Sequence, residues 1–390
     1  MPTKTLLQET QDLLIVGAGC SGLSLARELA LRGYRGKVVL LDQRTAFSND
    51  KTWSYWAKKE SRWHQLAEHY WDSCEISLRG GHRQQCDFHA YDYCSLPADT
   101  FYQDACSLID LGGYTVELGQ TVQTIEAIDD PPAKFKVTTT GGKIFFAKQL
   151  IECNARYQSA DYYQVFYGEE WLLHEPLPDW RRAGLMTELV SDEGGTDFIY
   201  WLALAPDRVL VEPTRFTQHM VDPEILQTKI EIWMTQYGLA PAQCIRHEEG
   251  VLPMGRVNSG HTSWPRAGLA AGALRASSGY GFLAMQHWAA ATAEQWIRTG
   301  RLETVDTYHP SVRFLDALFI KVLINQPRLG GDILSQVARA LPDDGFARFM
   351  AGEASVKDWL NVIMAMPKIP FIQALCQPRG FINSGGAKKC

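Results

Sequence analysis

The sequence lacks an excess of positive charge and clustered metal ligands, and each absence excludes a class of protein. Its 38 Lys and Arg stand against 44 Asp and Glu, which gives a net charge of −6. A nucleic-acid-binding domain normally carries a basic surface, so no nucleic-acid partner is expected. None of the ten His belongs to an H-E-x-x-H cluster of the kind that binds zinc. No metal site is therefore predicted.

Paired cysteines, a signal segment and long apolar runs are also missing. The nine Cys are scattered singly, without a C-x-x-C pair. No apolar core of a secretory signal precedes them, so they are expected to be reduced thiols in the cytoplasm. No run reaches the roughly 18 apolar residues of a membrane-spanning helix. We expect a chain that is soluble or that lies on a membrane without crossing it.

What the sequence does contain is typical of a folded protein with two lobes. A length of 390 residues suits two structural lobes, and 46% hydrophobic with 21% charged residues indicates a globular composition. The 12 Trp are a high count. They favour an aromatic-lined cavity or a surface at a lipid interface, because Trp joins a large apolar face to one polar N–H; an aromatic-rich core is the alternative.

The strongest motif lies in residues 12–44, where an apolar strand runs into G-x-G-x-x-G and then a helical pattern. Gly17 permits a tight turn, Gly19 lets a pyrophosphate approach the backbone, and Gly22 lets helix and strand pack closely. A second apolar strand ends at Asp42, which is placed to accept a hydrogen bond from a ribose hydroxyl. The pattern predicts a dinucleotide site, and its position at the start of the chain favours FAD over NAD. A purely structural turn is the alternative.

The middle of the chain reads as a run of strands, among them a hairpin of "DFIYWLAL" and "RVLVEPTRF". Alternation in the second strand places Leu210, Glu212 and Thr214 on one face. Among apolar neighbours the Glu212 carboxyl would have a raised pKa, stay protonated and be able to donate a proton. The alternatives are an exposed edge-strand carboxylate or an ion pair with Arg208 or Arg215.

The last third begins with residues 264–300, where an apolar strand-like run, a Gly/Ser-rich turn and a helix follow one another. A glycine turn at a helix N-terminus suits an anion or a flavin ring, which needs backbone N–H donors; Gly272 and Gly279 are the candidate flavin contacts. A structural strand-turn-helix is the alternative. Residues 301–390 have helical periodicity, either for packing on the core or for lying in a lipid interface.

Several stretches together resemble the bacterial FAD-dependent lycopene β-cyclases over almost the full length. They are the N-terminal "VGAGCSG…LLD", "TWSYW" at 52–56, "YQVFYGEEW" at 163–171, "VLVEPT" at 209–214, "EEGVLPMG" at 248–255 and "AGALRASSGYGF" at 271–282. The last one matches the family's second flavin motif. Order and spacing agree, which is more specific than any single motif.

The resemblance implies an α/β fold similar to p-hydroxybenzoate hydroxylase and geranylgeranyl reductase. A Rossmann-like FAD-binding lobe, residues 10–160 and 256–300, would be interrupted by a mainly antiparallel β-sheet substrate lobe, residues 161–255. Residues 301–390 would form a helical C-terminal region that associates with membranes.

The resemblance also implies a reaction without net redox. Reduced FAD, generated by NAD(P)H, would lie beneath the ψ-end of lycopene, an acid would protonate the terminal double bond, and loss of a proton would leave a β-ionone ring. Glu212 matches the family's essential acid. Aromatic faces for the cation are expected from Trp53, Trp56, Tyr200, Trp201 and Phe216. The hydrophobic polyene would come from the membrane, with the protein peripheral on the inner face of the cell membrane.

The sequence departs from the family pattern at three places. Many relatives have a second carboxylate directly after the catalytic acid, where this chain has Pro213, and a frequent Met-Asp pair appears here as Met186-Thr187. The acid of the flavin-domain "GD" motif is missing. The alternatives are a flavin-dependent reductase or monooxygenase, a cyclase of another polyene or prenyl chain, and a binder without catalysis.

Overall fold

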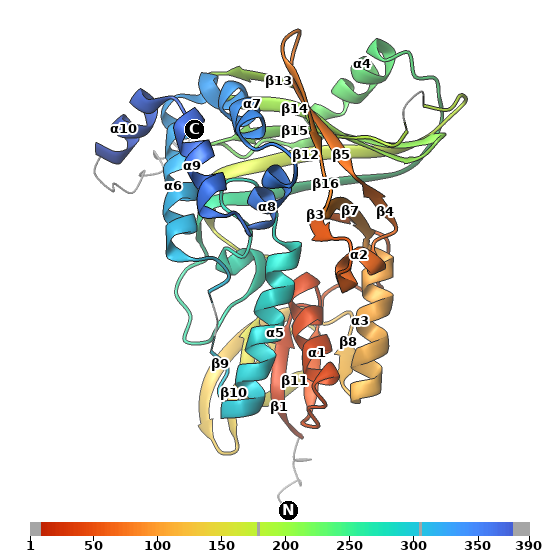
Figure 1. Ribbon diagram of the computed structural model, residues 1–390. Coiled ribbons are helices and arrows are strands. Elements are labelled where there is room, and N and C mark those ends of the chain that lie inside the picture. Colours follow the sequence, from red (N-terminus) through yellow and green to blue (C-terminus); the bar gives the residue numbers. More distant parts are fainter. Residues whose placement is uncertain (1–8, 178–179, 304–305, 377–390) are drawn as a thin grey trace, which may run out of the picture.

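The structure is a computed structural model that describes residues 9–177, 180–303 and 306–376. Two large sheets lie at opposite ends of an elongated molecule, and helices cover them (Figure 1). One sheet has six strands and the other has seven. This combination of parallel and antiparallel sheets with helices confirms the predicted α/β fold class.

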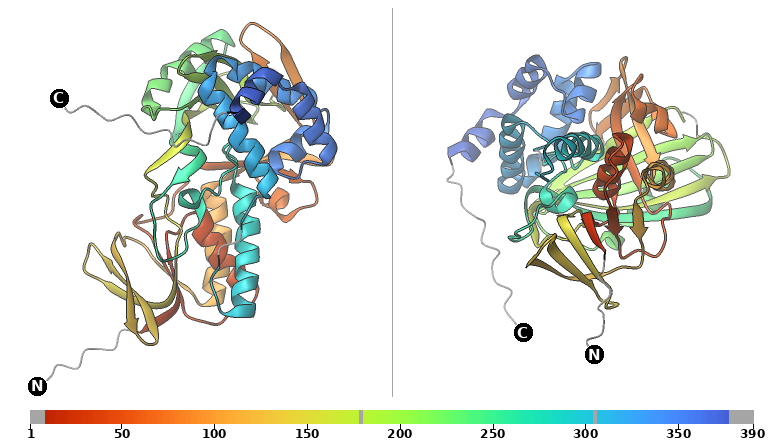
Figure 2. Two further views of the ribbon diagram at one scale, coloured as in Figure 1. Left: turned by 90° about the vertical axis from the view of Figure 1, so that its left-hand side faces the viewer. Right: turned by 90° about the horizontal axis from the view of Figure 1, so that it is seen from below.

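The six-stranded sheet carries the glycine-rich turn. In order across the sheet its strands are β8 (Thr115–Glu117), β2 (Val38–Leu41), β1 (Thr10–Val16), β11 (Ile144–Glu152), β10 (Ala133–Thr139) and β9 (Val122–Asp130). The first four are parallel and the last two antiparallel. One face is covered by the helices α5 (Phe282–Thr299), α1 (Cys20–Leu31) and α3 (Ala98–Gly112), with α1 in the middle (Figure 1, Figure 2). Apolar strands such as β1 suit a parallel sheet that is buried on both faces.

The seven-stranded sheet is mainly antiparallel. Its strands, in order, are β16 (Pro241–Asn258), β12 (Ser159–Leu173), β15 (Arg208–Thr217), β14 (Gly195–Ala205), β13 (Ala183–Asp192), β5 (Ser73–Leu78) and β6 (Arg83–Asp87). The predicted hairpin is β14 and β15. Residues 73–87 lie within the stretch that the predicted division gives to the FAD-binding lobe, yet β5 is hydrogen-bonded to β13 of this sheet.

Helices cover both faces of the seven-stranded sheet. On one face α4 (Thr228–Gln236) packs against β15, after the short 3-10 turn η1 (Pro223–Leu226). The helices on the other side are α6 (Pro310–Asn325), α7 (Gly330–Ala340), α8 (Asp344–Ala351), α9 (Val356–Ala365) and α10 (Lys368–Cys376), with η3 (Pro327–Leu329) between α6 and α7. Figure 2 shows α4 and this helical group on opposite sides. The predicted helical character of residues 301–390 holds for 306–376, and residues 377–390 lie outside the described residues.

The structure contains a third, smaller sheet, and one segment differs from its predicted local structure. The "TWSYW" stretch at 52–56 lies in a strand, β3 (Thr52–Lys58), which pairs with β7 (Tyr91–Pro97); β4 (His69–Trp71) completes this three-stranded sheet, and α2 (Arg62–Leu66) follows β3. The strand expected at the start of residues 264–300 is a 3-10 turn, η2 (Gly268–Ala271). Gly268 and Gly272 have φ of 72° and 70°, a left-handed conformation that interrupts a strand.

Candidate functional site

A cavity of about 1030 Å³ runs through the centre of the molecule. At one end it is lined by the glycine turn after β1, including Gly17 and Gly19, and at the other by Ile372 and Leu375 of α10. The inner face of the seven-stranded sheet forms one wall, with Glu212 of β15 in it. The cavity therefore joins the predicted nucleotide site to the predicted substrate sheet.

The three glycines of the first motif have three different surroundings. A Cβ at Gly17, whose φ is 108°, would lie 2.8 Å from the backbone N of Asn154. A Cβ at Gly22 would lie 1.9 Å from the carbonyl oxygen of Gly17, so only glycine lets α1 pack on the turn. A Cβ at Gly19 would meet no atom of the other described residues within 4 Å, and Gly19 lines the cavity. The open side at Gly19 gives a phosphate room to reach the backbone.

Asp42 lines the same end of the cavity and braces the turn. Its Oδ2 accepts a hydrogen bond from the backbone N–H of Ala18 (2.7 Å), and its Oδ1 accepts one from the backbone N–H of Arg44 (2.9 Å). The Arg44 Nε also donates to Oδ1 (3.1 Å), and its Nη1 donates to the Tyr102 hydroxyl (3.0 Å). Sequence reasoning missed Arg44, which places a cation at the end of the cavity where the phosphate and ribose of the dinucleotide are predicted to bind. The one feature of the sequence that could have indicated this role is its position two residues after Asp42.

One of the two glycines predicted in the second motif lines the cavity and the other does not. Gly279, with φ of 73°, lines the cavity, and a Cβ there would lie 2.4 Å from Gln164 Oε1. Gly272, predicted as a flavin contact, does not line the cavity; it ends the η2 turn. The buried atoms Gln164 Oε1 and Ser278 Oγ have no hydrogen-bond partner within the described part of the chain. Two unpartnered polar atoms in the cavity wall offer hydrogen bonds to a ligand.

Glu212 lies in the cavity wall on β15, on the same face as Leu210 and Thr214, as alternation predicts. The residue is only 8% exposed, and Thr214 Oγ1 donates to its Oε1 (3.3 Å). Burial, together with the negative charge of Glu248, raises the pKa of the Glu212 carboxyl well above its usual value. This environment therefore favours the protonated form of the carboxyl.

Both alternatives for Glu212 are ruled out by its surroundings. Strand β15 lies between β12 and β14, so it is not an edge strand. Arg208 is paired with the buried Glu170, and Arg215 is paired with Asp197 (2.5 Å) and Asp192 (2.7 Å). Neither arginine neutralises Glu212.

Four of the five predicted aromatic residues line the cavity: Trp53, Trp56, Tyr200 and Phe216. Trp201 is the exception and was wrongly placed. Tyr200 is paired with Glu212 on the neighbouring strand, so the adjacent Trp201 faces the opposite side of the sheet. There its ring packs against Trp233 of α4, with ring centroids 5.9 Å apart.

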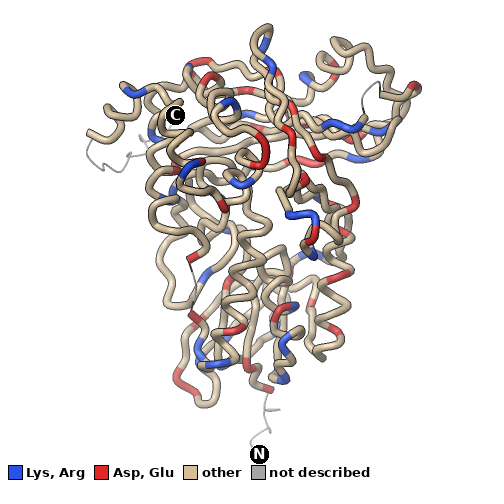
Figure 3. Tube along the Cα trace, in the orientation of Figure 1, with Lys and Arg blue, Asp and Glu red and all other residues tan. Residues whose placement is uncertain are grey.

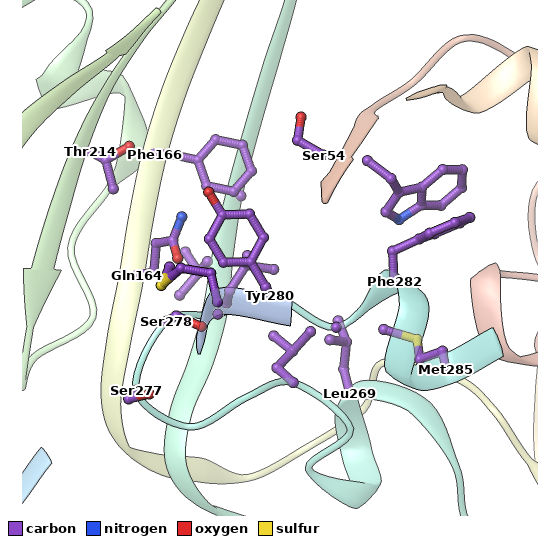
Figure 4. A pocket seen from close by; sticks show the side chains of 18 of the residues that line it. Ser54, Gln164, Phe166, Thr214, Leu269, Ser277, Ser278, Tyr280, Phe282 and Met285 are labelled. Atoms are coloured by element: carbon purple, nitrogen blue, oxygen red, sulfur yellow. The ribbon is translucent and has the colours of Figure 1, made fainter. Parts of the chain in front are cut away.

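Tyr200, which was predicted from the sequence, forms a cluster with Tyr93 and Tyr280, which sequence reasoning missed. The Tyr93 hydroxyl lies 3.0 Å from the Tyr200 hydroxyl and 3.1 Å from the Tyr280 hydroxyl, and Tyr200 also donates to Ser54 Oγ (2.9 Å). Burial raises the pKa of all three phenols well above the usual value, so they stay neutral. Figure 4 shows Tyr280 between the β12 side chains and the start of α5. The phenol rings thus form a neutral, polarisable wall.

A second acid was also missed. Glu248 of β16 lines the cavity, and its Oε2 accepts hydrogen bonds from Arg246 Nη1 (2.7 Å) and Thr52 Oγ1 (3.2 Å). Arg246 Nε donates to Glu170 Oε2 (2.6 Å). The signal for Glu248 was its place in the "EEGVLPMG" stretch, which β16 brings to the same wall as Glu212.

Comparison with known proteins assigns the chain to a family. The family model for "Lycopene cyclase protein" matches residues 12–376, nearly the whole chain. The chain belongs to the lycopene cyclase family. The resemblance predicted from the sequence motifs is thereby confirmed.

Relatives of this family member match over almost their full lengths. The lycopene beta-cyclase of Pantoea ananas is 24% identical over 95% of this chain and 98% of its own, and that of Paracoccus sp. is 25% identical over 95% and 97%. Among solved structures, a geranylgeranyl bacteriochlorophyll reductase-like protein of Thermoplasma acidophilum shares 14% identity with a TM-score of 0.60 and covers 94% of this chain and 98% of its own. A flavoprotein/dehydrogenase of Cytophaga hutchinsonii shares 13% with a TM-score of 0.57, over 89% and 93%. These two structures share the fold.

Proposed function

We propose that this protein is a lycopene β-cyclase, an isomerase that closes the ψ-ends of lycopene to β-ionone rings without net redox. The observation that carries the proposal is the position of the Glu212 carboxyl, buried in the wall of a large, mainly apolar cavity where burial favours its protonated form. A neutral carboxylic acid in such a place can donate its proton to an alkene, whereas water is too weak an acid to do so at neutral pH. Family membership supports the substrate.

The cavity wall suits the cation that protonation creates. The rings of Trp56, Tyr200 and Phe216 share the wall with Glu212, and aromatic faces attract positive charge. Burial of the wall keeps water away, and water would otherwise capture the cation. The neutral phenols of Tyr93 and Tyr280 bring no phenolate that could attack it.

The glycine turn and the second motif fit FAD. Gly19 leaves space at the backbone, Arg44 provides a cation near Asp42, and Gln164 and Ser278 offer unpartnered polar atoms further along the cavity. When bound and reduced by NAD(P)H, FAD would supply an electron-rich ring that stabilises positive charge. The residues of the chain hold the polyene end against Glu212 and exclude water.

We further propose that the protein lies on the cytoplasmic face of the membrane and takes the polyene from it. Ile363, Ile372 and Leu375 line the far end of the cavity, while Met364 and Ile369 of the same helices are exposed. Helix α10 has one charged residue, at its start (Figure 3). Among the described residues no single helix meets the length and hydropathy of a membrane span; α9 and α10 do so only together, and they are bent by 101°. An apolar rim around a cavity mouth suits contact with lipid.

The test supplies lycopene in liposomes together with FAD and NADPH. A product of unchanged mass that absorbs at shorter wavelength is expected. Glu212→Gln should lower conversion by about 100-fold or more, the range of general acid catalysis, while the bound flavin stays unchanged. A product that gains or loses hydrogen or oxygen would support the reductase or monooxygenase alternative and contradict the cyclase.

The matched control is Glu169→Gln. Glu169 is a buried carboxylate of β12 that bonds to Trp171 and Gln227 rather than lining the cavity. Its variant should keep the conversion of the original protein. An equal loss in both variants would mean that any buried charge change damages the fold, and would remove the support for Glu212.

A further inference from the structure

The two acids of the cavity wall lie in one row across three strands. Glu248 of β16 is paired with Gly168 of β12, and Gly168 in turn lies beside Glu212 of β15. A Cβ at Gly168 would be 3.3 Å from both Cβ and Cγ of Glu212 and 3.5 Å from its Oε2. The residue between the acids therefore has no side chain to separate the carboxyl groups.

Pro213 occupies the position at which many members of the family have a second carboxylate, and this position lies outside the cavity wall. Pro213 follows Glu212 directly, so it faces the opposite side of β15 and does not line the cavity. An acid at that position would point away from Glu212's neighbours in the wall. In this chain the second acid in the cavity comes from β16 instead.

The two carboxyls differ in their partners. Among the residues that the structure describes, the carboxyl of Glu212 accepts a hydrogen bond from the neutral Thr214 hydroxyl alone, whereas that of Glu248 accepts hydrogen bonds from Arg246 and Thr52. Burial raises the pKa of Glu248, and the Arg246 guanidinium counteracts that rise. The negative charge of Glu248 is one of the causes that raise the pKa of Glu212, so ionisation of both carboxyls at once is unfavourable. Because the cation is on the Glu248 side, the proton belongs to Glu212.

We propose that Glu248 is the proton acceptor of this reaction and the group that returns the proton to Glu212, a role that rests on the proposed cyclisation. The Glu212 O–H gives its proton to the terminal alkene carbon, and a C–C bond closes the ring. A C–H bond next to the ring cation then breaks, its electron pair becomes the ring double bond, and its proton goes to the Glu248 carboxylate. Transfer past Gly168 restores Glu212. No oxidant, reductant or solvent proton is consumed.

Glu248→Gln tests this role through the pH profile and the product. Removing the neighbouring negative charge lowers the pKa of Glu212, so the alkaline fall in activity should move to lower pH. The rate of β-ring formation should drop about tenfold or more, with a water-captured, hydroxylated ring product in its place. Glu248→Asp should keep the original product and most of the rate. The groups around the pair whose charges bear on the profile are Arg246, Glu170, Tyr200 and Tyr280.

Glu169→Gln is again the control, and it should leave both the pH profile and the product unchanged. If Glu248→Gln behaves like this control, Glu248 is not the acceptor and the inference is overturned. If the original protein does not convert lycopene at all, the proposed function fails instead.

Infrared titration of the flavin-loaded protein examines the pair without turnover. One carboxylic-acid band is expected near neutral pH, absent from Glu212→Gln and titrating at lower pH in Glu248→Gln. A band that disappears from Glu248→Gln but remains in Glu212→Gln would place the proton on the other acid. That result would overturn the inference even for an active cyclase.

Discussion

At the scale of single residues, the raised pKa of Glu212 makes the stability of the folded protein depend on pH. A carboxyl whose pKa is raised by folding stabilises the folded state while it is protonated, and this contribution is lost as the pH rises through its folded pKa. Glu212→Gln cannot ionise. Its melting temperature should therefore approach that of the original protein at acidic pH and exceed it increasingly as the pH rises.

Thermal unfolding of the two proteins across a pH series measures this difference, with Glu169→Gln as the control for loss of a buried carboxylate. A change that both variants share reports the removal of a buried carboxyl group and not the proton on Glu212. A gap between the original protein and Glu212→Gln that stays constant with pH would contradict a proton held on Glu212.

The residues of the wall were predictable to different degrees. Glu212 was found because strand alternation is local and its motif is specific. The same alternation excludes Trp201 from the cavity wall. Tyr200 faces the cavity, and the next residue of a strand faces the opposite side of the sheet. Glu248 and Tyr93 could not be placed by spacing, because they reach Glu212 through pairing between distant segments.

At the scale of elements, a buried ion pair ties the second glycine motif to the C-terminal helices. Arg275 follows η2, and its Nε lies 3.3 Å from Oδ2 of Asp316 in α6. The guanidinium also donates to the carbonyl of Phe349 in α8 and lies over its ring. The side chains of Arg275 and Asp316 are 1% and 6% exposed, so loss of one partner leaves the other charge buried.

Arg275→Met should therefore lower the free energy of unfolding by about 3–5 kcal/mol, as for other buried pairs that lose one partner. Denaturant unfolding measures this change. The exposed pair of Arg313 and Asp306 is the control, and Arg313→Met should cost less than about 1 kcal/mol. Equal losses in the two variants would show that the buried pair has no special role.

Elements with a clear period were predictable, and those set by distant contacts were not. The strand-turn-helix at the start of the chain and the hairpin of β14 and β15 follow from local pattern. The segment at 268–271 has a strand-like composition, but the left-handed glycines on either side prevent a strand. The pairing of β5 with β13 has no local signal, because Leu78 and Ala183 are 105 positions apart in the sequence.

At the scale of the whole molecule, the proposed membrane contact places the exposed apolar residues of α9 and α10 against lipid. Met364 and Ile369 are 76% and 70% exposed and do not line the cavity. The double variant Met364→Ser, Ile369→Ser should reduce co-sedimentation with liposomes several-fold, because it removes apolar surface from the contact. Conversion of lycopene supplied in detergent should stay unchanged.

Leu111→Ser provides the comparison. Leu111 is 77% exposed on α3, in the part of the molecule that holds the six-stranded sheet (Figure 1). Its loss should not alter liposome binding. If it weakens binding as much as the double variant, lipid contact would be general rather than confined to α9 and α10.

The two faces of β15 have a consequence for how this chain can be altered by directed evolution. Leu210, Glu212, Thr214 and Phe216 face the ligand space, while Val209 and Val211 face α4. A combinatorial library restricted to 210, 214 and 216 would therefore explore new polyenes with the scaffold intact. Randomising residues 209 and 211 would instead select for variants that restore the packing against α4, and it would give no information about substrate specificity.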